Sequence, residues 1–114
     1  MTEAPLFVQT LALAQWLLAN FAGEDPLARR VHGNALDLLD HVVLALKGFG
    51  REEQVDEADR SAALLRVHLR LALELRRLDE DRYLYLAEEM DGIGRQIGGW
   101  QKRLLSDTIS PRHR

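Results

Sequence analysis

Three breaks divide the chain into four long segments with the apolar spacing of helices. The breaks lie at 23–26, 48–50 and 77–79. The first combines a helix-ending glycine, a capping aspartate and a first-turn proline, and Asp79 in the third is a residue type that caps helix starts. The segments between them predict helices near residues 4–22, 26–47, 54–77 and 79–106.

Four amphipathic helices with short connections pack side by side, each antiparallel to the next. We therefore expect an all-α, antiparallel up-and-down four-helix bundle over residues 1–106. The remaining residues, 107–114, include Ser110-Pro111 and predict a flexible C-terminal tail.

The composition allows one globular domain and excludes several kinds of site. A chain of 114 residues, 46% of them hydrophobic and 29% charged, is large enough for one hydrophobic core but not for two. The absence of cysteine excludes a disulfide scaffold, a cysteine nucleophile and a thiolate metal site. The net charge of −3 argues against a nucleic-acid-binding protein that is basic over its whole surface.

The first segment is uncharged from Ala4 to Gly23. A signal peptide would begin with basic residues, whereas the early charge here is Glu3. A membrane span would be nearly continuously apolar, whereas Gln9 and Gln15 interrupt this segment. We therefore expect a cytoplasmic protein with no membrane partner.

Apolar periodicity predicts one core-facing stripe on each helix. The predicted stripes are Phe7, Leu11, Ala14, Leu18 and Phe21; then Leu36, Leu39, Val43 and Leu46; then Leu64, Val67, Leu71, Leu75 and Leu78; and last Tyr83, Ala87, Met90, Gly94, Ile97 and Leu104. On the third segment Leu65, Leu69 and Ala72 widen the apolar arc beyond what a bundle core requires. This surplus favours self-association into a homo-oligomer; the alternative is a leucine-rich helix covered by its own neighbours.

The sequence does not favour an enzyme. It contains no Glu-x-x-His pairs of a di-iron bundle, no Ser-His-Asp spacing, no P-loop and no dinucleotide-binding motif. Asp37 and His41 lie one turn apart but lack further ligands, so we interpret them as a solvated helix face. We expect no catalytic residue, no metal and no cofactor.

Basic side chains are the better candidates for a functional site, because thirteen of the fifteen are arginines, which make forked contacts with phosphate. The candidates are Arg66, Arg70 and Arg77 in a stripe on the third segment, Arg95, Lys102 and Arg103 on the fourth, and Arg29 and Arg30 at the start of the second. In a cyclic oligomer symmetry repeats such a stripe and concentrates positive potential. The alternative is that these arginines pair with carboxylates of the same chain, notably Glu74, Glu88 and Asp91.

Two glycines of the fourth predicted helix lie one turn apart. Each of Gly94 and Gly98 costs about 1 kcal/mol relative to alanine inside a helix. That cost is tolerable where backbones approach closely, so we expect a neighbouring helix to cross there with Trp100 packed beside it. The alternative, a frayed helix end, fits less well with the apolar pattern that continues through Leu104.

Two stretches resemble a known family. Residues 93–102, IGRQIGGWQK, resemble the last helix of the accessory variability determinant (Avd) family, the small accessory proteins of diversity-generating retroelements. Residues 63–71, ALLRVHLRL, resemble that family's third helix, in which two arginines one turn apart recur. The chain is also similar to the broader four-helix-bundle family encoded in ribosomal-RNA intervening sequences.

The resemblance implies a homopentameric barrel with a central channel and a non-catalytic function. Such a protein binds the retroelement reverse transcriptase and template-region RNA, with DNA as a second nucleic-acid candidate, and supports mutagenic cDNA synthesis. By position, the resemblance assigns Arg66 and Arg70 to the arginines of the third helix, Arg95 to the last-helix motif, and Lys102 and Arg103 to its basic end. The intervening-sequence similarity leaves open an interaction bundle with no polymerase partner.

Overall fold

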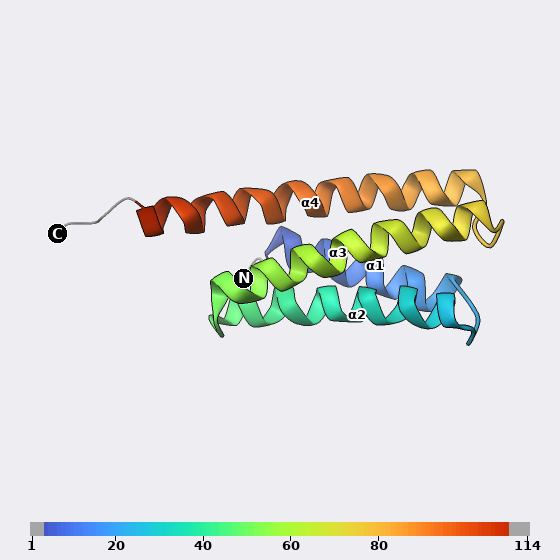
Figure 1. The fold of residues 1–114 in the computed structure, drawn as a ribbon, viewed down its shortest axis with the longest axis horizontal. Helices are drawn as coiled ribbons and strands as arrows, with labels where there is room; N and C mark the ends of the chain where they lie inside the picture. The colour runs from blue at the N-terminus through green and yellow to red at the C-terminus, as the bar shows by residue number, and fades with distance from the viewer. Residues whose placement is uncertain (1–3, 110–114) are drawn as a thin grey trace.

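The computed structural model describes residues 4–109, which form four helices. They are α1 (Pro5–Asn20), α2 (Pro26–Lys47), α3 (Arg51–Glu74) and α4 (Glu80–Ile109). Each helix packs against the next along the chain and α4 returns to α1, whereas the backbones of diagonally opposed helices stay farther apart. This arrangement, elongated along the helix axes (Figure 1), is an up-and-down four-helix bundle, so the predicted fold class is confirmed.

The helix boundaries agree best with the predictions where glycine and proline mark them. α2 runs from Pro26 to Lys47 as expected, and Gly48 ends it in the left-handed region with a φ of 89°. Gly50 is also left-handed, which lets the chain turn and restart a helix at once. As a result α3 begins at Arg51, three residues before the predicted start.

The predicted end of α3 was wrong. This helix stops at Glu74 because Arg76 adopts a left-handed φ of 59° and the Arg77 amide donates to the Ala72 carbonyl at 2.8 Å. α1 ends at Asn20, two residues earlier than expected, and α4 continues to Ile109, three residues later. The last part of the predicted tail, 110–114, lies outside the described residues.

The core consists of one stripe from each helix, and the predicted stripes of α1, α2 and α3 were wrong by about one position. In α1 the buried leucines are Leu6, Leu13 and Leu17, whereas Leu18 is exposed. α1 has apolar residues on both sides and no charge, so periodicity alone did not identify its inner face.

In α2 the buried stripe contains Leu38 and Val42 with the small residues Ala35 and Ala45, while the predicted Leu36 lies outside. Alanines line this face because α2 packs closely between α1 and α3. A stripe chosen by its large side chains alone therefore missed the inner face.

α3 carries more apolar residues than its contact with the core requires, as predicted. The residues that face the core, however, are not those of the predicted stripe. Leu65, Leu69 and Ala72 are buried. The residues exposed to solvent are Leu64, Val67, Leu71 and Leu75, with 44–64% of their surface accessible. We call these four residues the α3 apolar stripe. In α4, Met90 and Ile97 are buried as predicted, together with Leu86 and Ile93.

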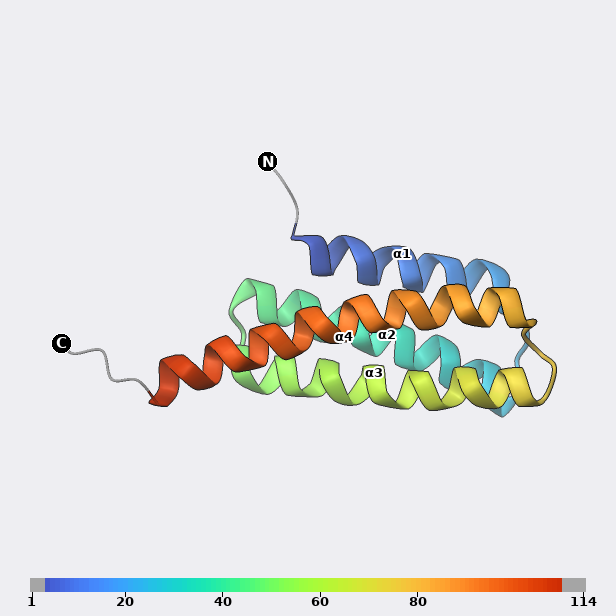
Figure 2. The same ribbon diagram turned by 90° about the horizontal axis from the view of Figure 1, so that it is seen from above.

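The two ends of the bundle differ because α4 has 30 residues and α1 has 16. Figure 2 shows α4 crossing the bundle obliquely: its first half lies between α1 and α3, and its second half diverges from α1 and extends past the ends of α2 and α3. The start of α1 and the second half of α4 therefore enclose an open end. No helix within residues 4–109 has an apolar stretch long enough to cross a bilayer.

Candidate functional site

The two arginines of the third-helix stretch are both paired with carboxylates of their own chain. Arg66 forms an ion pair with Asp91 of α4 at 2.9 Å, and Arg70 with Glu74, one turn along α3, also at 2.9 Å. The hydrogen bond from Glu74 raises the pKa of the Arg70 guanidinium. Both pairs are largely exposed and contribute little to stability. In the single chain, Arg66 and Arg70 therefore follow the alternative interpretation, in which the arginines pair with carboxylates of the same chain.

Arg77 does not lie in a helical stripe with them, because it lies beyond the end of α3. Its guanidinium makes a two-pronged contact with Asp25, Nη1 to Oδ2 and Nη2 to Oδ1, each at 3.0 Å. It also donates to the Ala22 carbonyl and lies 5.3 Å from the centroid of the Phe21 ring. Arg77 thus joins the α1–α2 connection to the α3–α4 connection, which is a structural role.

The basic residues in the second half of α4 are different, because they form no ion pair with any described residue, whereas Arg82 in the first turn pairs with Asp79 at 3.6 Å. Arg95, Lys102 and Arg103 are exposed on the second half of α4. Arg29 and Arg30 are exposed in the first turn of α2 and likewise form no ion pair within residues 4–109. Of the eight predicted cationic residues, these five are therefore available for an external anion in the single chain.

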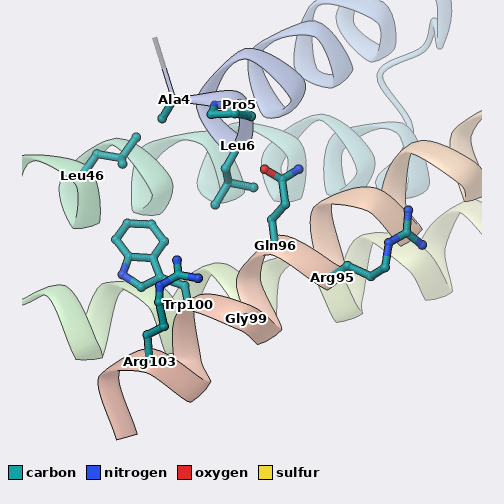
Figure 3. A pocket seen from close by; sticks show the side chains of 9 residues that line it. All are labelled: Ala4, Pro5, Leu6, Leu46, Arg95, Gln96, Gly99, Trp100 and Arg103. Carbon is teal, nitrogen blue, oxygen red and sulfur yellow. The ribbon is translucent and has the colours of Figure 1, made fainter. Parts of the chain in front are cut away.

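The open end of the bundle contains a pocket of about 390 Å³ (Figure 3). Leu6 at the start of α1 and Leu46 at the end of α2 form its apolar side, and Trp100 of α4 lies opposite them. Arg103 lines the pocket beside Trp100, whereas Arg95 lies at its edge and extends away from the indole. Among residues 4–109, no carboxylate lines the pocket.

The opposite side of the same part of α4 is acidic. Asp56 of α3 accepts a hydrogen bond from Gln101 at 3.0 Å, and Glu52 and Asp56 line a smaller hollow with Leu104 and Leu105. The second half of α4 therefore has arginines on its side toward α1, whereas its other side adjoins the acidic start of α3. The net charge of −3 describes the whole chain and does not show this local separation of basic and acidic residues.

The predicted close approach of backbones at Gly94 and Gly98 is wrong within the chain. A Cβ at Gly98 would meet no atom within 4 Å, and one at Gly94 would meet the Arg66 guanidinium at 3.4 Å. The tight position is Gly92, where a Cβ would lie 2.7 Å from the Gln9 amide nitrogen. Trp100 is half-buried and packs against the core of its own chain.

Gln9 is the polar residue on which the α1–α4 contact depends, and periodicity did not single it out. Its amide nitrogen donates to the Glu89 carboxylate at 3.2 Å, and its oxygen accepts a hydrogen bond from Gln96 at 2.6 Å. These bonds tie α1 to α4 immediately before the two helices separate. Gln96 also lines the pocket, so this network forms its inner boundary.

The three histidines within residues 4–109 have structural partners. His32 donates from Nε2 to the Phe21 carbonyl, and Nδ1 of His41 is hydrogen-bonded to Gln54, each at 2.6 Å. The half-buried His68 accepts a hydrogen bond at Nδ1 from Asn34 at 2.8 Å. No group of three or more potential metal-ligating side chains gathers among the described residues.

Comparisons with known proteins give no match: no protein-family model, no curated protein and no solved structure is similar to this chain.

Proposed function

We propose that the protein is a non-catalytic accessory factor of a diversity-generating retroelement. In this proposal it forms a cyclic homo-oligomer, a pentamer by the family resemblance, in the cytoplasm. It binds the retroelement reverse transcriptase and template RNA and thereby supports mutagenic cDNA synthesis.

The observation that carries the proposal is the α3 apolar stripe. Leu64, Val67, Leu71 and Leu75 recur at intervals of three or four residues, so they form one continuous ridge on the outside of the bundle. Continuous exposed apolar surface on a soluble protein marks an interaction site. The ridge lies on the helix whose sequence resembles the family's third helix, and a second copy of the chain offers a ridge of the same apolar character.

The last-helix stretch supplies the second support. Arg95 belongs to it and Lys102 ends it, with Arg103 next along the chain, and none of the three has a carboxylate partner among residues 4–109. Unpaired guanidinium groups are available for forked contacts with phosphate. We therefore assign RNA contact to α4, and we place Arg66 and Arg70 second because Asp91 and Glu74 already neutralise them.

The second candidate function is an interaction bundle of the intervening-sequence type, without a polymerase partner. The observation that favours it is the intrachain pairing of Arg66, Arg70 and Arg77. If these arginines only make contacts within the chain, the stretch that resembles the family's third helix does not bind RNA through Arg66 and Arg70. Both candidates predict a homo-oligomer, so oligomeric state does not separate them.

Co-expression with a reverse transcriptase encoded beside this chain separates the two candidates. The accessory-factor proposal predicts that the polymerase co-purifies with the protein and that template RNA is retained at low salt and released as salt rises. Arg95→Gln combined with Arg103→Gln is expected to reduce RNA retention. Arg60→Gln is the matched control, because Arg60 is an exposed arginine on α3 that pairs weakly with Glu57 at 3.8 Å. Failure of the polymerase to co-purify would favour the interaction-bundle candidate.

A further inference from the structure

The pocket at the open end combines an apolar wall, an aromatic ring and a cationic side chain. One wall is apolar, formed by Leu6 and Leu46, and the opposite wall carries the half-buried indole of Trp100. The Arg103 guanidinium lies beside this indole, as expected for positions three apart on a helix. We infer that this pocket binds an unpaired base of single-stranded RNA, with the base stacked on Trp100 and the adjacent phosphate held by Arg103.

The charges around the pocket favour an anionic ligand. Arg95 and Arg103 both contribute to the lining, and neither forms an ion pair with a described residue. They lie eight positions apart on α4, about 12 Å along the helix axis, so a strand that follows α4 meets both. The acidic residues of the neighbouring hollow, Glu52 and Asp56, lie on the opposite side of α4, and Asp56 accepts a hydrogen bond from Gln101.

The shape of the pocket favours a planar, partly apolar group. A volume of about 390 Å³ lies within the range of small-molecule pockets and admits one base. An aromatic ring stacks with any base, whereas a base within a duplex has no free face to offer. The site is therefore expected to select single strands over duplex RNA without strong sequence preference.

This inference rests on the RNA-binding part of the proposed function, but its test requires no polymerase. The protein has two tryptophans, and Trp16 packs against Tyr85 on the opposite part of the bundle from the pocket. Trp16→Phe therefore leaves Trp100 as the single source of indole fluorescence. Titration of this variant with a single-stranded oligouridylate, with a self-complementary RNA duplex and with an acidic peptide containing leucine reports directly on the pocket.

We expect the oligouridylate to quench the Trp100 fluorescence, and the duplex and the peptide to leave it unchanged. In the protein that retains Trp16, Trp100→Leu keeps an apolar side chain against the core and is expected to weaken oligouridylate binding, measured by fluorescence anisotropy, about fivefold or more. Arg103→Gln is expected to reduce the slope of log affinity against log salt by about 0.7. Lys102→Gln removes the same charge one position away, outside the pocket, and is expected to have a smaller effect on affinity than Arg103→Gln.

Three results would overturn the inference. One is unchanged oligouridylate affinity in Trp100→Leu, with circular dichroism showing that the variant is folded. Another is equal loss of affinity in Arg103→Gln and Lys102→Gln, which would indicate general attraction to charge. The third is quenching by the peptide but not by RNA, which would assign the pocket to a protein partner. If the oligouridylate binds as described but no polymerase co-purifies, the pocket stands and the accessory-factor proposal fails.

Discussion

Arg77 and Asp25, separated by 52 positions in the sequence, join two connections of the bundle through two hydrogen bonds of 3.0 Å. The α1–α2 and α3–α4 connections lie at the same end of the molecule (Figure 1), and this pair holds them together. The hydrogen bonds from Arg77 lower the pKa of the Asp25 carboxyl below its ordinary value of 3.8.

Substitution of either partner is expected to destabilise the fold. Arg77→Gln and Asp25→Asn each remove the charge-assisted contact, and Arg77→Lys keeps the charge but loses the fork. Urea denaturation of both single variants and the double variant gives the coupling between the two residues. Losses that add in the double variant would show that the pair contributes no joint stabilisation.

The stability of the protein is expected to decrease as pH falls below 6.5. Burial and the nearby Arg30 lower the pKa of His68 from its ordinary value of 6.5, and Asn34 donates to its Nδ1, which requires the neutral ring. As pH falls through 6.5, the unfolded chain therefore binds the proton first and the folded state loses relative stability. Asp25 acts in a separate range, because its depressed pKa gives stability that is lost only below about pH 3.8.

Denaturation midpoints measured from pH 7.5 to 5 check this expectation. His68→Gln keeps a side-chain oxygen that can accept the Asn34 hydrogen bond but does not titrate. Its stability is expected to vary less over this range than that of the natural protein. An identical pH profile in the two proteins would assign the effect to other groups.

Arg76→Gly is expected to stabilise the protein. Arg76 has a left-handed φ of 59° at the end of α3, a conformation that costs an L-residue about 1 kcal/mol and glycine almost nothing. α2 ends in the same way with Gly48, at a φ of 89°. Gly48→Ala is the matched control and is expected to destabilise by about 1 kcal/mol. A stabilising Gly48→Ala variant would contradict this account of the helix ends.

Gly98→Ala is expected to raise the stability of α4 by up to about 1 kcal/mol, because a Cβ there meets no atom within 4 Å. Gly92→Ala gains less or loses stability, since its Cβ would displace the Gln9 amide. Thermal denaturation monitored by circular dichroism compares the two variants. A loss of stability in Gly98→Ala would show that another backbone approaches Gly98 in the assembled protein.

The sequence predicts the helices and their order well, because Pro26 and Gly48 mark helix ends by their own backbone preferences. It predicts the end of α3 poorly, since arginine has no intrinsic preference for the left-handed conformation that Arg76 adopts. The inner face of α1 was missed because this helix has no charge to mark its solvent side. The excess of apolar residues on α3 was predicted, but periodicity alone did not show which of these residues face the core and which face solvent.

The candidate site was only partly predictable. Arg95 and Arg103 were identified as basic positions, but not the pocket that they line. That pocket exists because α1 is shorter than α4, which brings Leu6 and Leu46 opposite Trp100. Pairing between distant positions, such as Arg66 with Asp91, likewise depends on how α3 and α4 align.

The central claim of this account is that other copies of the chain cover the α3 apolar stripe. Val67 and Leu71 are the middle residues of the stripe, and Val67→Glu or Leu71→Glu places charge there without entering the core. Leu84→Glu is the matched control, because Leu84 is an equally exposed apolar residue on α4, outside the stripe.

Multi-angle light scattering of the purified protein and these variants tests the claim most directly. We predict a mass several times 13.0 kDa for the natural protein and for Leu84→Glu, with five copies as the number that the family resemblance implies. The stripe variants are expected to elute as folded 13.0 kDa monomers. A natural protein that elutes at 13.0 kDa at all concentrations, or stripe variants that keep the full assembled mass, would contradict the claim.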